Sequence, residues 1–286
     1  MKKMYKNAPL PFQGQKRRFI GAFGLALEQL KNKQDIKIII DLFGGSGLLS
    51  HTAKQMFPQC DVIYNDFDNY SGRLKNIKQT NILLSKVRHL VKDCLKDKKI
   101  ESDIRQSILD LIKETEQYVY VDYITLSASL LFSGKYALNY EELEKQSFYN
   151  CVKATDYDED IISYLDGIDI QSCDYRELYE KYKNVQGVLF LVDPPYLSTD
   201  CSTYKSDKYW KLRDYLDVLN VLVDSNYVFF TSNKSSLIEL CEWFDENRNI
   251  GNPFKNSVLN TQNITINKTS SGTSGYTDMM LYKFVK

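Results

Sequence analysis

The sequence Asp193-Pro194-Pro195-Tyr196 combines residue types that could handle an amino group. It follows the apolar run 188–192, which predicts a buried parallel strand. Two prolines stiffen the turn and leave carbonyl oxygens without competing N–H groups. The Asp193 carboxylate and the Pro194 carbonyl can accept both hydrogens of an exocyclic amine, and this orients the nitrogen lone pair toward an electrophile. Tyr196 offers a face on which a planar base can stack, worth roughly 1–3 kcal/mol; a merely structural proline-rich turn is the alternative.

A glycine-rich turn from Asp41 to Gly47 follows an earlier apolar run and leads into a predicted helix. Its glycines allow close backbone approach to a ligand, and the helix N-terminus favours negative charge. The spacing fits neither a dinucleotide fingerprint nor a P-loop, so we interpret it as a site for a nucleoside-type cofactor, with a structural tight turn as the alternative. Asp66 ends the next predicted strand, where a carboxylate can accept hydrogen bonds from ribose hydroxyls. Asp68 is close enough to take that role instead.

The elements around these residues predict an α/β fold with a parallel sheet. A strand, a helix and a second strand form a βαβ unit, and further strands with an intervening helix come later. The chain end alternates like a terminal edge strand, whereas a polar segment before it predicts a loop. The ranges are strands at 35–41, 61–66, 188–192, 227–230 and 279–284, helices at 48–57 and 211–223, and the loop at 260–277.

Between Asp66 and about residue 169 the pattern becomes helical, with helices predicted at 74–95 and 104–118. A mostly helical insertion in an α/β domain is the simplest account. We place the insertion at 81–165 and the other domain at 1–80 and 166–286.

Composition and charge indicate which binding partners, metal sites and cell compartment to expect. The chain has 286 residues and no net charge, with 37 Lys+Arg against 37 Asp+Glu. Residues 73–100 nevertheless hold nine cations against two acids, which predicts either a phosphate-facing surface or a solvated helix face. No apolar run reaches the length of a membrane span, and no secretory signal is recognisable. Six scattered cysteines and two histidines favour neither a zinc site nor a disulfide framework, so we expect reduced thiols and a cytoplasmic protein.

Three motifs in this order resemble the Dam-type, D12-class DNA adenine N6-methyltransferases. They are Pro11-Phe12-Gln13-Gly14-Gln15-Lys16, matching the family's F-x-G-x-K segment, then Phe43-Gly44-Gly45-Ser46-Gly47, then Asp193 to Tyr196. Phe12 stands where members often carry Trp, and Gln15 where a second Gly is common, as in a phage or prophage branch. The family places its target-recognition segment where the helical insertion is predicted.

The resemblance implies a Rossmann-like methyltransferase sheet with helices on both faces, S-adenosyl-L-methionine (SAM) as cofactor and double-stranded DNA as substrate. It implies direct in-line methyl transfer to N6 of an adenine that has flipped out of the duplex. We expect a monomer without membrane contact, and a restriction endonuclease is a partner that such an enzyme can have. We expect loops 198–208 and 270–277 to contact DNA. The predicted catalytic residues are Asp193, Pro194, Pro195 and Tyr196, and the predicted cofactor-binding residues are Phe12, Gly14, Lys16, Asp41, Phe43, Gly44, Gly45, Gly47, Asp66, Asp174 and Asp193.

Three other functions compete with this prediction. A methyltransferase of the same fold could act on RNA or a protein side chain, because related turns serve several planar amides and amines. A NAD-dependent oxidoreductase would explain the first βαβ unit but would leave the Asp-Pro-Pro-Tyr turn without a role. A catalytically silent nucleic-acid-binding module would bind DNA without binding SAM.

Overall fold

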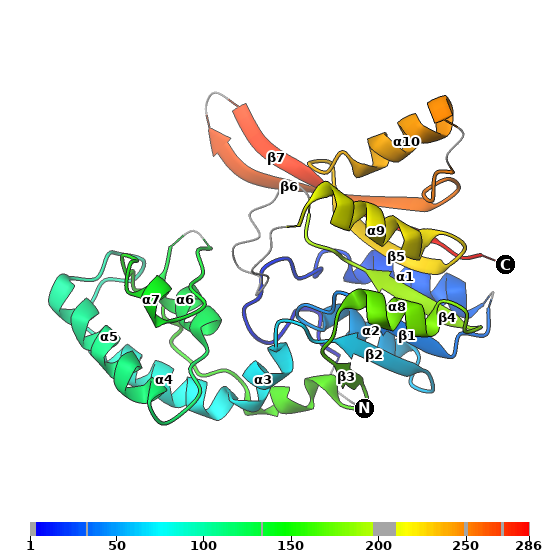
Figure 1. Ribbon diagram of the computed structural model, residues 1–286. Helices are drawn as coiled ribbons and strands as arrows, with labels where there is room; N and C mark the ends of the chain where they lie inside the picture. The colour runs from blue at the N-terminus through cyan, green and yellow to red at the C-terminus, as the bar shows by residue number, and fades with distance from the viewer. Residues whose placement is uncertain are drawn as a thin grey trace. The chain divides into compact units, whose positions relative to one another are not determined.

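Seven strands form one mixed sheet in the order β3-β2-β1-β4-β5-β7-β6 (Figure 1). The computed structural model describes residues 4–32, 34–132, 134–196, 210–248, 251–269 and 272–285. Strands β1 to β5 run parallel to one another, and β7 pairs antiparallel with β5 and β6. The strands are β1 Ile38–Asp41, β2 Asp61–Asn65, β3 Asp169–Gln171, β4 Val188–Val192, β5 Asn226–Ser232, β6 Val258–Thr269 and β7 Gly272–Lys283.

The strand order reverses between β1 and β4. The chain moves outward from β1 through β2 to β3, then returns to pair β4 with the other side of β1. In open α/β sheets, ligands bind outside the carboxyl ends of the strands at such a switch point. Asp41 ends β1 and Asp193 follows β4, so both predicted site residues lie at this position.

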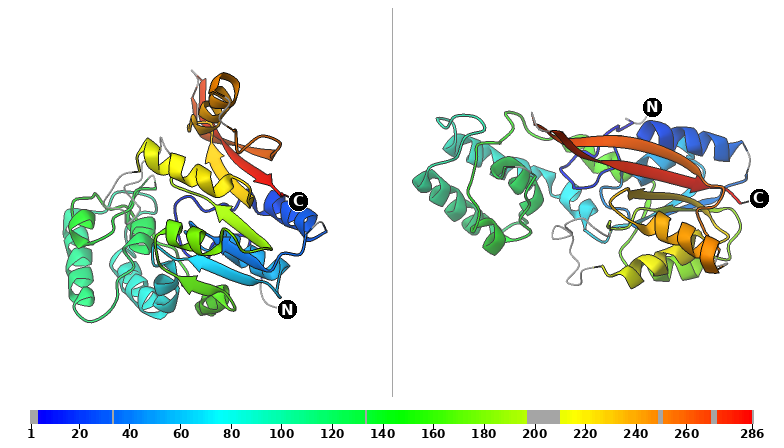
Figure 2. Two further views of the ribbon diagram at one scale, coloured as in Figure 1. Left: turned by 45° about the vertical axis from the view of Figure 1, so that its right-hand side comes forward. Right: turned by 90° about the horizontal axis from the view of Figure 1, so that it is seen from above.

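Helices cover both faces of the sheet (Figure 2). Side chains alternate between faces along a strand. Phe229 belongs to a core shared with three helices, whereas the next residue, Phe230, packs edge-on against Phe19 and Phe23 at ring centroid distances of 5.6 and 6.5 Å. The helices on the Phe229 face are α8 Tyr175–Tyr182, α9 Leu212–Leu222 and α10 Leu237–Arg248, and those on the other are α1 Ile20–Lys31 and α2 Leu48–Met56.

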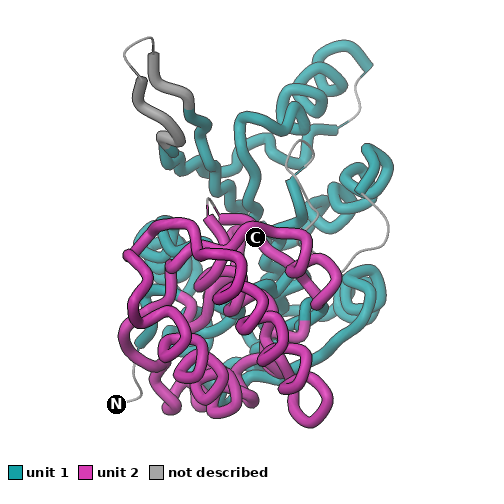
Figure 3. The backbone as a smooth tube through the Cα atoms, turned by 90° about the vertical axis from the view of Figure 1, so that its left-hand side faces the viewer, with its two compact units in different colours: residues 1–7, 15–68, 165–286 teal, residues 8–14, 69–164 magenta. Residues whose placement is uncertain are grey.

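The chain divides into two units, coloured separately in Figure 3. The sheet unit holds residues 1–7, 15–68 and 165–286, and the helical unit holds residues 8–14 and 69–164. The helical unit thus begins before the predicted residue 81 and includes part of the N-terminal segment. Its helices are α3 Tyr70–Lys75, α4 Ile77–Leu90, α5 Ser102–Glu116, α6 Tyr123–Leu130 and α7 Tyr140–Leu143, with a 3-10 helix over Glu159–Leu165 at the boundary.

A buried ion pair organises the helical unit. Arg73 Nε lies 3.0 Å from both carboxylate oxygens of Asp122, and both side chains are almost fully buried. The same guanidinium donates to the Pro11 carbonyl at 2.8 Å, and the Tyr70 hydroxyl bonds to the backbone of Leu10. These contacts fasten residues 10 and 11 to α3 and α6. A buried charge pair is a weak source of net stability, so its effect here is to fix the backbone in one place.

The local predictions are confirmed for the β1–α2–β2 unit and for β4, β5 and α9. The predicted helix 74–95 is instead divided between two helices: α3 ends at Lys75, and α4 runs from Ile77 to Leu90. Asn76 separates them, because its side-chain amide donates to the Gly72 carbonyl and competes with the helical backbone pattern.

Two predictions near the C-terminus are wrong. The segment 260–277 is largely a β-hairpin rather than a loop, because its backbone groups pair between β6 and β7 even though few residues are apolar. The last strand, β7, lies between β5 and β6 and is therefore not an edge strand. The expected DNA-contacting segment 198–208 lies outside the described residues. Among the helices that the structure describes, none is long and apolar enough to span a membrane.

Candidate active site

The glycine turn after β1 is shaped by its contact with the next strand. A Cβ atom on Gly44 would lie 2.1 Å from two ring atoms of Tyr64 and 2.9 Å from the Asn65 carbonyl oxygen. Gly45 and Gly47 have φ values of 50° and 68°, a region that glycine enters without strain. Gly47 then caps the N-terminus of α2. The turn therefore keeps its backbone close to the end of β2. Its role as a ligand loop stays a prediction.

Asp41 is a fully buried carboxylate at the end of β1. The Ser50 hydroxyl on α2 donates to its Oδ2 at 2.7 Å, while Oδ1 is buried and has no hydrogen-bond partner among the described residues. Burial raises the pKa of Asp41 to about 7, and the Ser50 hydrogen bond opposes that rise. Such a group favours a cationic ligand, which would restore the carboxylate's lost solvation.

Asp193 and Lys16 form a charged pair at the end of β4. Lys16 Nζ lies 2.5 Å from Asp193 Oδ2, and the side chains are 9% and 15% exposed. Asp193 Oδ1 is buried with no hydrogen-bond partner within the described ranges. Burial raises the pKa of Asp193, and the Lys16 ammonium opposes this. The ammonium also lies 5.2 Å from the Tyr196 ring centroid, so Lys16 connects the two ends of the Asp-Pro-Pro-Tyr turn.

Asp66 follows β2 at the same edge of the sheet and is almost fully buried. The Tyr64 hydroxyl lies 3.0 Å from Asp66 Oδ1 and 2.7 Å from the Gly45 carbonyl oxygen. Asn65 joins the neighbouring strand ends, since its amide donates to the carbonyls of Leu42 and Cys173 at 3.0 Å. These bonds hold the predicted ribose-binding acid in register with the glycine turn. Asp68 is less buried than Asp66.

An aromatic cluster surrounds Phe43. Its ring lies 4.8 Å from Tyr175 and 5.7 Å from Trp210, measured between centroids, and those two rings are stacked at 5.9 Å. Asp174, predicted to lie near the cofactor adenine, immediately precedes this cluster. Its carboxylate caps α8 through the Arg176 backbone N–H and also pairs with the Arg176 guanidinium, which lowers the pKa of Asp174. In this structure the Asp174 carboxylate is therefore already paired with Arg176.

The structure brings Lys16, Asp41, the 43–47 turn, Asp66 and residues 193–196 together at the carboxyl edge of one sheet. Phe12 and Gly14 belong to the helical unit instead. Within that unit, the Phe12 ring meets Tyr70 edge-on at a centroid distance of 5.8 Å, and Gly14 has a φ of 80°. Their role in cofactor binding stays a prediction.

Sequence reasoning missed several residues of the site. Ser50 is one helical turn past the glycines on α2, and a hydroxyl at that spacing was a usable signal. Asn65 immediately precedes the predicted acid and could also have been noted. Trp210 and Asp278 carry no local motif, because only the packing of distant strands and helices brings them to this edge.

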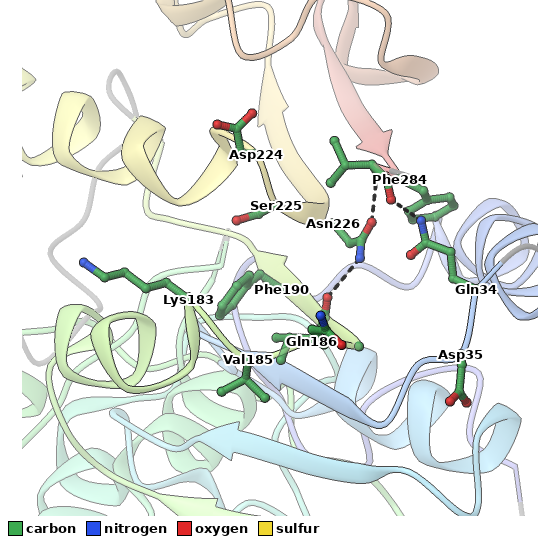
Figure 4. Close-up of a pocket in the computed structure, with 13 residues that line it drawn as sticks. Gln34, Asp35, Lys183, Val185, Gln186, Phe190, Asp224, Ser225, Asn226 and Phe284 are labelled. Carbon is green, nitrogen blue, oxygen red and sulfur yellow. Dashed lines mark hydrogen bonds between the residues drawn. The ribbon is translucent and has the colours of Figure 1, made fainter.

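The cavity in Figure 4 lies at the opposite, amino-terminal edge of β4 and β5 and has a volume of about 940 Å³. Asn226 spans it by donating to the Val188 carbonyl and accepting from the Val285 N–H, and Gln34 donates to the Val285 carbonyl. These bonds attach the end of the chain to the sheet. None of the predicted catalytic residues lines the cavity.

The strand order and the turn at the switch point fit the Rossmann-like α/β fold of the SAM-dependent methyltransferases. The profile of the family described as D12 class N6 adenine-specific DNA methyltransferase matches residues 12–250. A curated protein of Haemophilus influenzae named "Putative methyltransferase" is 37% identical over 289 residues, covering 99% of this chain and 94% of that protein. The chain belongs to the D12 class N6 adenine-specific DNA methyltransferase family, whose methyl donor is SAM.

The residues present fit that cofactor. SAM carries a cationic α-amino group and a cationic sulfonium, and the site holds two buried carboxylates, Asp41 and Asp193. Each has one oxygen without a hydrogen-bond partner among the described residues. An unpaired buried acceptor is costly, so both oxygens favour a donor or cation from a ligand.

Proposed function

We propose that Asp193 and the Pro194 carbonyl accept the two N6 hydrogens of an adenine that has left the DNA duplex, while SAM is held at the ends of β1 and β2. The observation that carries this proposal is the buried Oδ1 of Asp193, which lacks a hydrogen-bond partner in the described parts of the chain. The other oxygen of the same carboxylate is held by Lys16. This arrangement leaves one acceptor available beside a proline carbonyl.

Lys16, Asp193 and Tyr196 then each have one task. Lys16 fixes the Asp193 carboxylate and balances its charge, so Asp193 acts as a hydrogen-bond acceptor rather than a strong base. Tyr196 stacks on the extruded base and offsets part of the few kcal/mol that flipping costs. SAM supplies the activated methyl group when it is bound. The protein contributes chiefly by holding the amine nitrogen and the methyl carbon in line.

The cofactor contacts follow from the same geometry. Asp41 suits the cationic amino group, and Asp66 suits the ribose hydroxyls beside the 43–47 turn. The aromatic cluster around Phe43 offers flat faces for the cofactor adenine, with Asp174 as a further contact once Arg176 releases it. Phe12 and Gly14 extend the site in this proposal because they match the family segment that ends at Lys16.

The helical unit is the proposed target-recognition part. It contains the basic stretch 73–100, but several of those nine cations have internal partners. Arg73 pairs with Asp122, Lys78 with Glu159 and Arg88 with Asp156, and Lys96 donates to the Val152 carbonyl at 2.6 Å. The remaining cations of this stretch are the candidates for phosphate contacts. A DNA substrate supports the expected cytoplasmic location. The monomeric state, the phage-type branch and a restriction endonuclease partner stay predictions.

The proposal is tested with Asp193→Asn, which keeps the shape of the side chain but replaces one acceptor with a donor. We expect methyl transfer to DNA to fall by at least about a hundredfold in a folded protein, the usual loss when a preorganised hydrogen-bonding group at the reacting centre is removed. Asp245→Asn is the matched control, because Asp245 lies in the same unit and pairs with Lys255 at 3.1 Å rather than with a residue of the site. Full transfer by Asp193→Asn would contradict the proposed role.

A further inference from the structure

Two polar groups at the carboxyl edge of the sheet have no role in the proposed reaction. They are Ser232 Oγ and Asp278 Oδ1, and both are buried atoms without a hydrogen-bond partner among the described residues, as is Asp193 Oδ1. Buried polar atoms are usually satisfied, so Ser232 Oγ and Asp278 Oδ1 need an explanation. The strand register shows how they are related.

Ser232 ends β5, and Asp278 lies directly opposite it on β7. Phe230 and Met280 also lie opposite each other, and each is two residues away from Ser232 or Asp278 on its own strand. Directly opposed residues in an antiparallel pair share a face, and so do residues two apart on one strand. Phe230, Ser232, Asp278 and Met280 therefore lie on one face of the sheet, with the Ser232–Asp278 pair nearer the edge where Asp193 lies.

Lys16 lies over this face. Its Nζ is 5.8 Å from the Phe230 ring centroid and 2.5 Å from Asp193 Oδ2. Asp278 is one side-chain position beyond Phe230, which places its carboxylate within electrostatic range of the same ammonium. The charged groups that act on Asp278 are Lys16, Arg18 and Lys234, which attract it, and Asp193, which repels it. Tyr276, on the same strand, also faces Asp278, and the directly paired residue on β6 is the neutral Gln262.

We propose that Asp278 is a positioning residue that shares the Lys16 ammonium with Asp193. This inference rests on the proposed role of Asp193 as the acceptor of the adenine amine. An ammonium held by Asp193 alone competes with that amine for the carboxylate. A second carboxylate within electrostatic range of Lys16 holds the ammonium in place while Asp193 turns its acceptors to the substrate. Asp278 thus acts through Lys16 and does not touch the reacting atoms.

The first test compares Asp278→Asn with the wild type in single-turnover methyl transfer to duplex DNA over a range of pH. We expect the plateau rate to fall about tenfold while the Kd for SAM changes less than twofold. We also expect the acidic limb of the rate profile to move to lower pH, because Asp193 loses a negative neighbour and its pKa falls. Asp245→Asn, which removes an acid paired with Lys255 at 3.1 Å elsewhere in the sheet unit, is the matched control and should keep the wild-type profile.

A double-variant cycle with Lys16→Gln separates positioning from a structural effect. If Asp278 acts through Lys16, Asp278→Asn adds little to the loss already caused by Lys16→Gln. Additive losses, or an unchanged rate and pH profile in Asp278→Asn, would overturn the inference. Asp278→Glu retains the charge and must perform better than Asp278→Asn; the reverse ranking would show a steric role instead. None of these results depends on Asp193→Asn, whose retention of activity would reject the proposed function itself.

Discussion

At the residue scale, Asp41 shows how a binding group can oppose folding. It is fully buried, and its pKa is raised from 3.8 to about 7 by that burial. Between these two pH values the unfolded chain has released the proton and the folded chain still holds it. Stability therefore falls as pH rises through this range and is lowest above the folded-state pKa. A carboxylate retained at this cost suits a ligand that needs its charge.

Asp41→Asn should accordingly change stability and binding in opposite directions. At pH 8 the ligand-free variant should be more stable than the wild type by roughly 2–4 kcal/mol, because no buried charge remains. Its affinity for SAM should fall at least about tenfold, because the cationic ligand loses its partner. Urea unfolding across pH 5 to 8 and calorimetric titration with SAM measure the two effects.

The pH dependence of binding provides the control for this prediction. The wild-type affinity should weaken about tenfold more than that of the variant between pH 8 and pH 6, because Asp41 gains a proton in that interval. The ratio of the SAM affinities of the two proteins is the correct readout, since the α-amino group of the ligand titrates near pH 8 in both measurements. A variant that binds SAM as tightly as the wild type would show that Asp41 is only structural.

At the element scale, the parts of the fold with strong local patterns could be predicted from the sequence. The apolar runs of β1 and β4, with glycine or proline turns directly after them, predict both the strands and the site residues that follow them. The hairpin of β6 and β7 could not be predicted in this way, because its strands form through backbone pairing with each other rather than through an apolar face that the sequence would reveal. Asp278 was missed for the same reason, since it meets Ser232 only through the register of β5 and β7.

Gly44→Ala tests the contact between the glycine turn and β2. The added methyl group would overlap the Tyr64 ring, which is fully buried and bonded through its hydroxyl to the same turn. We expect the free energy of unfolding to fall by about 1–3 kcal/mol and SAM affinity to fall at least about tenfold. Gly21→Ala in α1 is the matched control, because its Cβ would meet no atom within 4 Å. Gly21→Ala should raise the free energy of unfolding by about 0.5–1 kcal/mol and leave SAM binding intact. Equal changes in the two variants would contradict the packing argument.

At the scale of the whole molecule, the chain joins a sheet unit that holds the predicted catalytic residues to a helical unit that contains the basic stretch 73–100. The N-terminal segment passes from one to the other between Gly14 and Gln15, two residues before Lys16. Arg73 and Tyr70 hold the start of this segment through its backbone at Leu10 and Pro11. The lysine that pairs with Asp193 is therefore covalently close to a segment fixed by the helical unit.

The central claim is that the Asp-Pro-Pro-Tyr turn of this chain directs a methyl group to N6 of adenine in DNA. The most direct measurement is transfer of labelled methyl from SAM to unmethylated duplex DNA, followed by digestion to nucleosides. We predict that the label appears in N6-methyladenine, and sequencing of the product then gives the target site. Label in RNA or protein but not in DNA, or in a base other than adenine, would contradict the claim.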